Sequence, residues 1–206
     1  MQIKKSYITI LELFRKDIFL SKTMRELAIM ANKDYPIVYN TLKELEKNKI
    51  IKIKKIGNSN VCEFSFSYES ISIMSFLDEQ HALSKNIPNI NKILEFKDFL
   101  DDILLVTGSY AKEKQNKSSD IDLVIITKEN AFNKQKLIEN LTSLYLPKIH
   151  AFVITQKDFK EMLLDSKANF GKEMFKSRLL FKNTFRYYEL LKEAIENGFR
   201  GWIILN

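Results

Sequence analysis

Residues 108–126 read GSYAKEKQNKSSDIDLVII, and this stretch decides how the rest of the chain is interpreted. Two carboxylates, Asp120 and Asp122, stand one residue apart at the start of an apolar run. Successive residues of a strand point to opposite faces of a sheet, so both carboxylates are expected on one side. The run that follows, Leu123–Ile126, is apolar at every position, which is typical of a strand covered on both faces.

The carboxylate pair predicts a site for a divalent cation and a phosphate-bearing ligand. Two carboxylates held side by side repel each other, and a hard cation such as Mg²⁺ offsets that repulsion by taking oxygen ligands. A second buried run, Ile103–Val106, predicts a neighbouring strand, and Gly108 and Ser109 follow it closely. The backbone amides and hydroxyl of such a turn suit phosphate oxygens. The residues alone therefore predict a Mg²⁺–nucleotide site.

The spacing of these residues resembles a known signature. Gly108-Ser109, ten residues, then Asp120-Ile121-Asp122 is similar to the pattern of the nucleotidyltransferase superfamily, the DNA polymerase β-like group, and residues 90–160 look like its minimal nucleotidyltransferase branch. The resemblance implies that the two aspartates hold Mg²⁺ and act in catalysis, and that a nucleoside triphosphate is the substrate or ligand. It also implies that Gly108 and Ser109 bind the nucleotide, while Lys112 either reaches a phosphate or is a solvated loop lysine.

Two positions depart from the family pattern. Where the family often has a second glycine, this chain has Glu113, which we expect to alter the turn and to bring negative charge towards a triphosphate. The strand expected at Lys148–Thr155 contains no Asp or Glu, although active members carry a third acid there, and Asp158 is expected to begin a helix. His150 and Phe152 occupy the same-face positions of that strand. His150 either replaces the acid as a catalytic base or marks a site that binds nucleotide without transferring it.

The positive charge of the chain is concentrated near its N-terminus. The formal net charge is +7, and residues 1–60 alone carry 13 Lys and Arg against 6 Asp and Glu, which is also +7. This asymmetry favours a module that binds a polyanion, joined to a second part without net charge. A solvated basic face is the alternative interpretation.

Residues 6–67 resemble the winged helix-turn-helix domain of transcriptional regulators. Thr23 and Glu26 form a capping-box pattern, Asp34 and Pro36 predict the start of the next helix, and residues 57–60 between two alternating runs predict a hairpin. Such domains bind duplex DNA in the major groove, although some mediate protein–protein contacts instead. Apolar residues at positions 38, 42 and 45 would face the core. The residues expected to contact DNA are Tyr35, Tyr39, Asn40, Lys43 and Lys47 on the helix, and Lys52, Lys54, Lys55 and Asn58 on the hairpin.

The expected architecture is α+β. Residues 1–68 form a winged helix, residues 69–88 a connecting helix, and residues 89–206 a mixed nucleotidyltransferase-fold sheet with flanking helices and a C-terminal helical part. The aromatic residues at 185, 187 and 188 either line a base-stacking pocket or, more often for such spacing, pack in the core. A lone cysteine, Cys62, excludes an intramolecular disulfide and a cysteine-rich zinc site. No apolar run is long enough to span a membrane, and we expect a cytoplasmic protein.

Three functions follow from these patterns. The first is transfer of a nucleotidyl group from a Mg²⁺-bound nucleoside triphosphate to an unknown acceptor. The second is transcriptional regulation by a DNA-binding protein whose degenerate transferase domain senses nucleotide or mediates homodimer formation. The third is an antitoxin that contacts a toxin partner.

Overall fold

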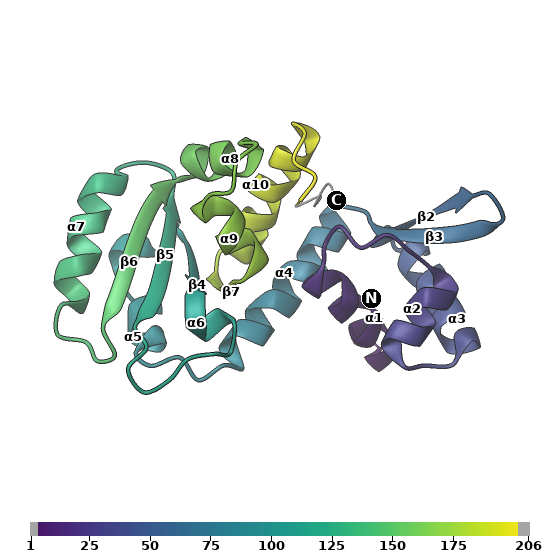
Figure 1. Cartoon of the computed structure of the whole chain (residues 1–206), viewed down its shortest axis with the longest axis horizontal. Helices are drawn as coiled ribbons and strands as arrows, with labels where there is room; N and C mark the ends of the chain where they lie inside the picture. The colour runs from purple at the N-terminus through teal and green to yellow at the C-terminus, as the bar shows by residue number, and fades with distance from the viewer. Residues whose placement is uncertain (1–3, 202–206) are drawn as a thin grey trace. The chain divides into compact units, whose positions relative to one another are not determined.

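The computed structural model describes residues 4–201, and the chain forms two compact units that divide between Leu77 and Asp78 (Figure 1). The division falls within helix α4 (Tyr68–Leu83), and the last turns of this helix belong to the C-terminal unit. The helix that was predicted as a connector therefore ends before Pro88. Among residues 4–201, no helix is both long enough and apolar enough to cross a lipid bilayer.

The described part of the N-terminal unit contains three complete helices, the first turns of α4 and a small antiparallel sheet with strand order β1-β3-β2. The order of its helices and its hairpin along the chain agrees with the expectation from the sequence. Its elements are α1 (Lys5–Lys16), β1 (Lys22–Thr23), α2 (Met24–Ala31), α3 (Tyr35–Lys47), β2 (Ile51–Ile56) and β3 (Ser59–Phe64).

The starts of α2 and α3 differ in how they are capped. At α2 the predicted capping box is confirmed, because the Thr23 hydroxyl accepts from the Glu26 amide at 3.2 Å and the Glu26 carboxylate accepts from the Thr23 amide at 2.8 Å. At α3 the cap residue is Asp34, as expected, but its side chain makes no capping hydrogen bond. The proline in the first turn, Pro36, has a fixed φ that suits a helix start.

The amphipathic pattern of α3 is confirmed. Val38, Leu42 and Leu45 are buried, and no more than 1% of the surface of each residue is exposed to solvent. Strands β2 and β3 are joined by a two-residue turn, in which Gly57 has φ +57°, a left-handed conformation that glycine adopts without steric cost. The hairpin that follows α3 therefore has the position predicted from its turn residues.

The C-terminal unit is built on a four-stranded mixed sheet with strand order β6-β5-β4-β7. Strands β5 and β6 run parallel, whereas β4 pairs antiparallel with both β5 and β7. The last strand lies in the part expected to be helical, and it joins the sheet beside β4. The strands are β4 (Ile103–Thr107), β5 (Ile121–Thr127), β6 (Ile149–Thr155) and β7 (Leu179–Lys182).

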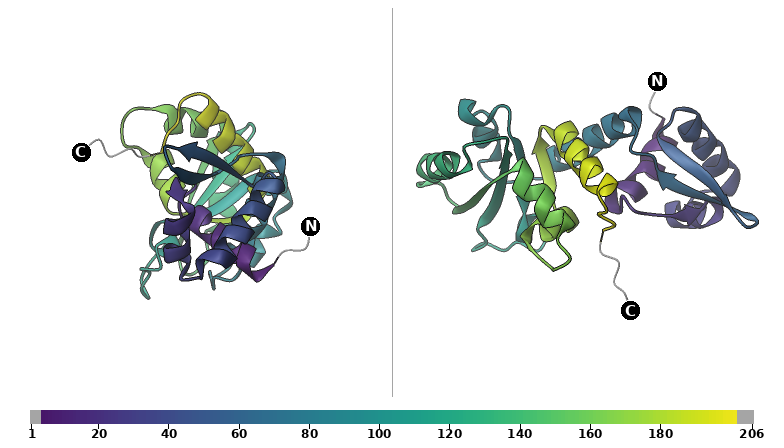
Figure 2. Two further views of the ribbon diagram at one scale, coloured as in Figure 1. Left: turned by 90° about the vertical axis from the view of Figure 1, so that its right-hand side faces the viewer. Right: turned by 90° about the horizontal axis from the view of Figure 1, so that it is seen from above.

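Helices cover both faces of this sheet (Figures 1 and 2). On one face, alternate residues such as Leu123 and Ile125 pack in a core with residues of α5 and α7. On the other face, α8 and α10 contact the central strands. The helices of this unit are α5 (Ile90–Leu94), α6 (Gly108–Ala111), α7 (Ala131–Thr142), α8 (Gln156–Leu164), α9 (Phe170–Lys176) and α10 (Thr184–Glu196), with a 3-10 turn, η1, at Lys97–Phe99.

A buried polar network inside the C-terminal unit connects α4, α10 and Arg178, the residue directly before β7. The Tyr188 hydroxyl donates to the Asp78 carboxylate at 2.5 Å, and the Arg178 guanidinium lies 3.5 Å from the same carboxylate. Burial and the neighbouring Asp78 raise the pKa of Tyr188, so its hydroxyl stays protonated. Tyr187 and Tyr188 are both fully buried. These two aromatic side chains are therefore core residues and do not line a base-stacking pocket.

Candidate functional site

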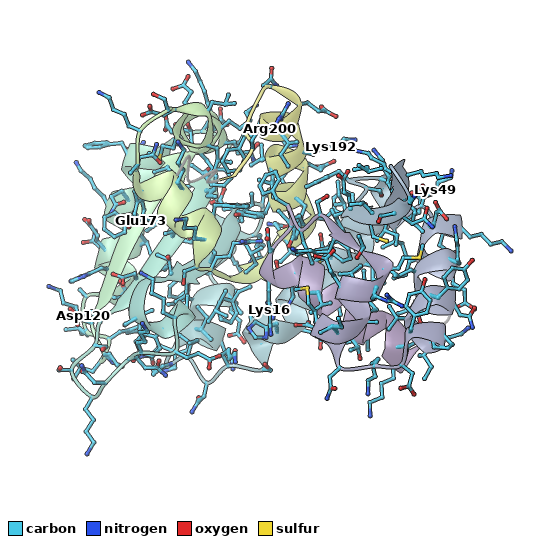
Figure 3. All side chains as sticks on the ribbon, turned by 45° about the vertical axis from the view of Figure 1, so that its right-hand side comes forward. Lys16, Lys49, Asp120, Glu173, Lys192 and Arg200 are labelled. Carbon is cyan, nitrogen blue, oxygen red and sulfur yellow. The ribbon has the colours of Figure 1, made fainter. Side chains whose placement is uncertain are left out.

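Strand register brings the predicted carboxylates and histidine together at one end of the sheet. Thr107 on β4 pairs with Asp122 on β5, and Asp122 pairs with His150 on β6, so the three residues form a row across the sheet. Asp120 comes just before β5, at the end of the strands (Figure 3). His150 Nε2 lies 3.4 Å from Asp120 Oδ2, and His150 Nδ1 lies 3.9 Å from Asp122 Oδ1. All three side chains are partly exposed, which leaves them accessible to a ligand.

Gly108 makes room for the carboxylate of Asp122. Its φ is +69°, and a Cβ atom at this position would lie 2.9 Å from Asp122 Cγ and would overlap Asp122 Oδ2. A side chain here would therefore be strained by the backbone and would displace the carboxylate. The next residue, Ser109, is half-buried, and within residues 4–201 its hydroxyl makes no hydrogen bond. The turn thus places an available hydroxyl directly after the glycine that supports Asp122.

Burial and the charges of neighbouring side chains determine the pKa of Asp122. Partial burial raises the pKa of Asp122, and the negative charge of Asp120 raises it further, while His150 and Lys112 act in the opposite direction. Lys112, although exposed, is therefore close enough to influence the site. A cation bound between the carboxylates would relieve the same repulsion.

Glu113 occupies a left-handed position in the turn. Its φ is +54°, a conformation that glycine adopts without steric cost but that costs other residues about 1–2 kcal/mol. The carboxylate of Glu113 accepts from Lys85 Nζ at 2.5 Å, and this pairing lowers the pKa of Glu113. The expected negative charge is thus present but partly neutralised by Lys85.

Strand β6 supplies His150 but no third acid. Asp158 lies beyond the opposite end of this strand, where it forms a capping box with Thr155 at the start of α8, as expected for a helix start. Its carboxylate therefore caps α8 and does not reach the row of Thr107, Asp122 and His150. The side chain of β6 that lies near both aspartates is His150, at 3.4 Å from Asp120 and 3.9 Å from Asp122.

The donor set suits a hard divalent cation that also binds a phosphate ligand. Mg²⁺ in proteins is commonly held by one or two carboxylates, with substrate phosphates and water completing its shell. Asp120 and Asp122 supply two such carboxylates. Within residues 4–201, no group of three or more His, Cys, Asp or Glu side chains is arranged to hold a metal ion.

A cavity beside β6 was not predicted from the sequence. It has a volume of about 390 Å³ and adjoins the histidine of the candidate site. Helix α7 contributes one wall, and no residue spacing indicates that the end of this helix returns to the edge of the sheet. The residues around it are Glu139, Thr142, Ser143 and Lys148–Phe152.

Comparison with protein families identifies the region that contains this site. Residues 87–179 match a family model described as nucleotidyltransferase domain. The matched segment includes Gly108, Ser109, both aspartates and His150, and it supports the assignment of this region to the nucleotidyltransferase superfamily. At this coarse level, the match supports nucleotidyl transfer as the activity of the region. Comparison with curated proteins gave no match, and comparison with solved structures gave none either.

The residues predicted to contact DNA are all exposed on the N-terminal unit. Two of the lysines are engaged in ion pairs, because Lys43 Nζ lies 3.0 Å from Glu46 and Lys54 Nζ lies 2.5 Å from Glu63. Large apolar side chains near the turn between α2 and α3 are also exposed, with Ile29 at 75%. They border an open cavity that the sequence did not indicate, lined by Arg25, Ala28, Ile29, Asn32, Lys33, Asp34, Tyr35 and Ile37.

Proposed function

We propose that the C-terminal unit transfers a nucleotidyl group from a Mg²⁺-bound nucleoside triphosphate to a hydroxyl group of an acceptor. The observation that carries this proposal is the row of Asp122 and His150, with Asp120 beside them, inside a segment that matches a nucleotidyltransferase domain. A cation held by Asp120 and Asp122 would neutralise charge on the phosphates and on the departing pyrophosphate.

The turn after β4 would bind the phosphates. The Ser109 hydroxyl makes no hydrogen bond to the described residues, so it can donate to a phosphate oxygen. Lys112 lies close enough to act on the charge of Asp122 and would place an ammonium group beside the same phosphates. Gly108 carries no side chain, and its open space is filled by Asp122. Its main contribution is therefore to position a carboxylate.

His150 would act as the base for the acceptor. The acceptor oxygen forms a bond to the α-phosphorus, the bond from that phosphorus to the bridging oxygen of pyrophosphate breaks, and the proton of the acceptor hydroxyl passes to a ring nitrogen of His150. The imidazole lies within 3.9 Å of both carboxylates, which would stabilise the charge that it gains. This role replaces the third acid that the strand lacks.

Label transfer tests the proposal. The purified protein with Mg²⁺ is incubated with each nucleoside triphosphate, labelled at either the α- or the γ-phosphate, in the presence of cell-extract proteins and RNA. We expect label to be transferred from the α-position only, to be lost in Asp120→Asn and Asp122→Asn, and to fall by about 10²- to 10⁴-fold in His150→Ala. Glu129→Gln, an exposed acid beyond the far end of β5, is the matched control and should keep full activity. Transfer that persists in Asp120→Asn, or label arriving from the γ-position, would contradict the proposal.

A second proposed function is DNA binding by the N-terminal unit as a winged helix. It is supported by the excess charge of +7 within residues 1–60 and by the exposure of all nine predicted contact residues. Exposed Ile29 and Tyr35 add apolar surface of the kind that meets thymine methyl groups. Regulation of transcription, homodimer formation and a toxin partner remain predictions of the sequence.

Salt dependence tests the second function. A protein that neutralises phosphates releases counterions, so the logarithm of the binding constant should fall linearly with the logarithm of salt concentration, by about 0.9 for each phosphate contacted. Fluorescence anisotropy with a labelled random-sequence duplex measures this slope. Binding that is absent at low salt, or insensitive to salt, would exclude a DNA-binding role.

A further inference from the structure

One aromatic pair lies beside the candidate site, and one of its rings is exposed to solvent. The Phe152 side chain is 44% exposed although it is large and apolar. Its ring lies 5.0 Å from the ring of Phe170, with an angle of 51° between their planes. Phe152 is exposed because β6 is the edge strand of the sheet, so no further strand covers its outer side. An apolar ring left open to solvent at a polar site is a candidate surface for a flat ligand.

Phe152 faces the same side of the sheet as the carboxylates. It is two residues from His150 on one strand, and alternate residues of a strand share a face. It is level with Val124 on β5, as His150 is level with Asp122. The exposed ring is therefore the next same-face side chain after the histidine, moving along β6 away from the end of the sheet.

The distance from the phosphate turn to this ring matches an extended nucleotide. Gly108 follows β4, which is two strand positions from β6. Thr107 is level with His150 across the sheet, so Gly108 lies two strand spacings across and three residues along from Phe152, which amounts to about 14 Å. An extended nucleoside triphosphate covers such a distance between its terminal phosphate and its base. With the α-phosphate beside Asp122, the ribose would pass His150 and the base would reach Phe152.

We propose that Phe152, supported by Phe170, is the surface on which the nucleobase stacks. This inference rests on the proposed function, because it assigns the base of the same nucleotide whose phosphates the aspartates and Ser109 would hold. Phe170 holds the Phe152 ring from one side, and the exposed area of Phe152 receives the base. Stacking on aromatic rings tolerates every base, since each has a π-face.

Phe152 and Phe170 would contact the flat face of the base and would not form hydrogen bonds with its edges. The polar side chain next to Phe170 is Asn169, and its amide group is already engaged with Met162 and with the backbone of Lys172. The substrate class is therefore a nucleoside triphosphate with any base, with purines preferred over pyrimidines because their rings offer more stacking area.

Calorimetric titration with two ligands distinguishes the contribution of the base to binding from that of the phosphates. ATP and inorganic tripolyphosphate are each titrated, with Mg²⁺, into the wild-type protein and into Phe152→Leu, Phe152→Ala and Phe152→Tyr. Loss of stacking should weaken ATP binding by about 5- to 150-fold in the Leu and Ala variants, while tripolyphosphate binding stays unchanged. The Phe152→Tyr variant keeps an aromatic ring and should retain the ATP affinity of the wild type. ATP and GTP should bind the wild type more tightly than CTP and UTP.

The outcomes distinguish this inference from the proposed function. Equal ATP affinity of the wild type and Phe152→Leu would overturn base stacking and leave nucleotidyl transfer intact. A matching loss of tripolyphosphate affinity would also overturn it, because Phe152 would then act through the fold of the site. A wild-type protein that binds neither ATP nor tripolyphosphate would overturn both the stacking surface and the proposed function.

Discussion

The substitution Gly108→Ala tests the packing of the candidate site directly. Two costs are expected. The left-handed φ of +69° is unfavourable for alanine by about 1–2 kcal/mol. In addition, the new Cβ atom would overlap Asp122 Oδ2, so the carboxylate must rotate, and a side chain forced away from its rotamer costs about 0.5–1.5 kcal/mol. We therefore expect a total loss of about 1.5–3.5 kcal/mol in the free energy of unfolding.

A double-mutant cycle separates the two costs. In Asp122→Ala the carboxylate is absent, and the Cβ atom of residue 122 would lie 3.4 Å from the new methyl group, an ordinary contact. Gly108→Ala made in that background should then cost only the backbone contribution of about 1–2 kcal/mol. The difference between the two backgrounds, about 0.5–1.5 kcal/mol, measures the contact between Gly108 and the carboxylate.

Urea unfolding followed by circular dichroism of the four proteins gives these free energies. Thermal unfolding provides a second measure, since 1 kcal/mol shifts the Tm of a chain of this size by about 2–4 °C. The same cost in both backgrounds would refute the reasoning, because it would mean that Asp122 does not pack on Gly108. No cost in either background would show that the turn does not hold its left-handed conformation.

Three further predictions concern other features of the chain. Glu113→Gly should be more stable than Glu113→Ala by about 1–2 kcal/mol in urea unfolding, because only glycine adopts φ +54° without cost; equal stabilities would show that the turn is not left-handed there. Asp78→Asn should lower the free energy of unfolding by about 3–5 kcal/mol, because it leaves the buried Arg178 guanidinium without its carboxylate, and a loss below 1 kcal/mol would contradict that pairing. Lys47→Ala should reduce the salt slope of DNA binding by about 1, while Lys43→Ala should reduce it by less, because Lys43 is already paired with Glu46; an equal reduction by both would argue against this difference.

The local elements of this protein were predictable because they depend on neighbours in the chain. The capping box of Thr23 and Glu26 involves residues three positions apart, and the buried stripe of α3 follows from helical spacing. The apolar run Leu123–Ile126 lies within β5, as expected for a covered strand. Periodicity also placed Asp120 and Asp122 on one side of their strand, and the family resemblance supplied the meaning of that pair.

Other features depended on contacts that spacing does not encode. The pairing of β7 with β4 joins segments more than seventy residues apart. The sequence indicated a negative charge at Glu113, but not that Lys85, which comes from another part of the unit, would pair with it. Tyr187 and Tyr188 were ambiguous between core and ligand surface until their burial was known.

The stretch from Gly108 to Asp122 contains features that the sequence predicted and features that only the tertiary structure decided. By itself the sequence determined that a small turn and two carboxylates would flank neighbouring strands, because strand alternation and turn composition are local properties. Only the tertiary structure decided that Gly108 leaves its space to Asp122, that His150 stands level with that carboxylate, and that an exposed Phe152 follows it. These arrangements depend on strand order and register, which are set by packing between segments distant in the chain.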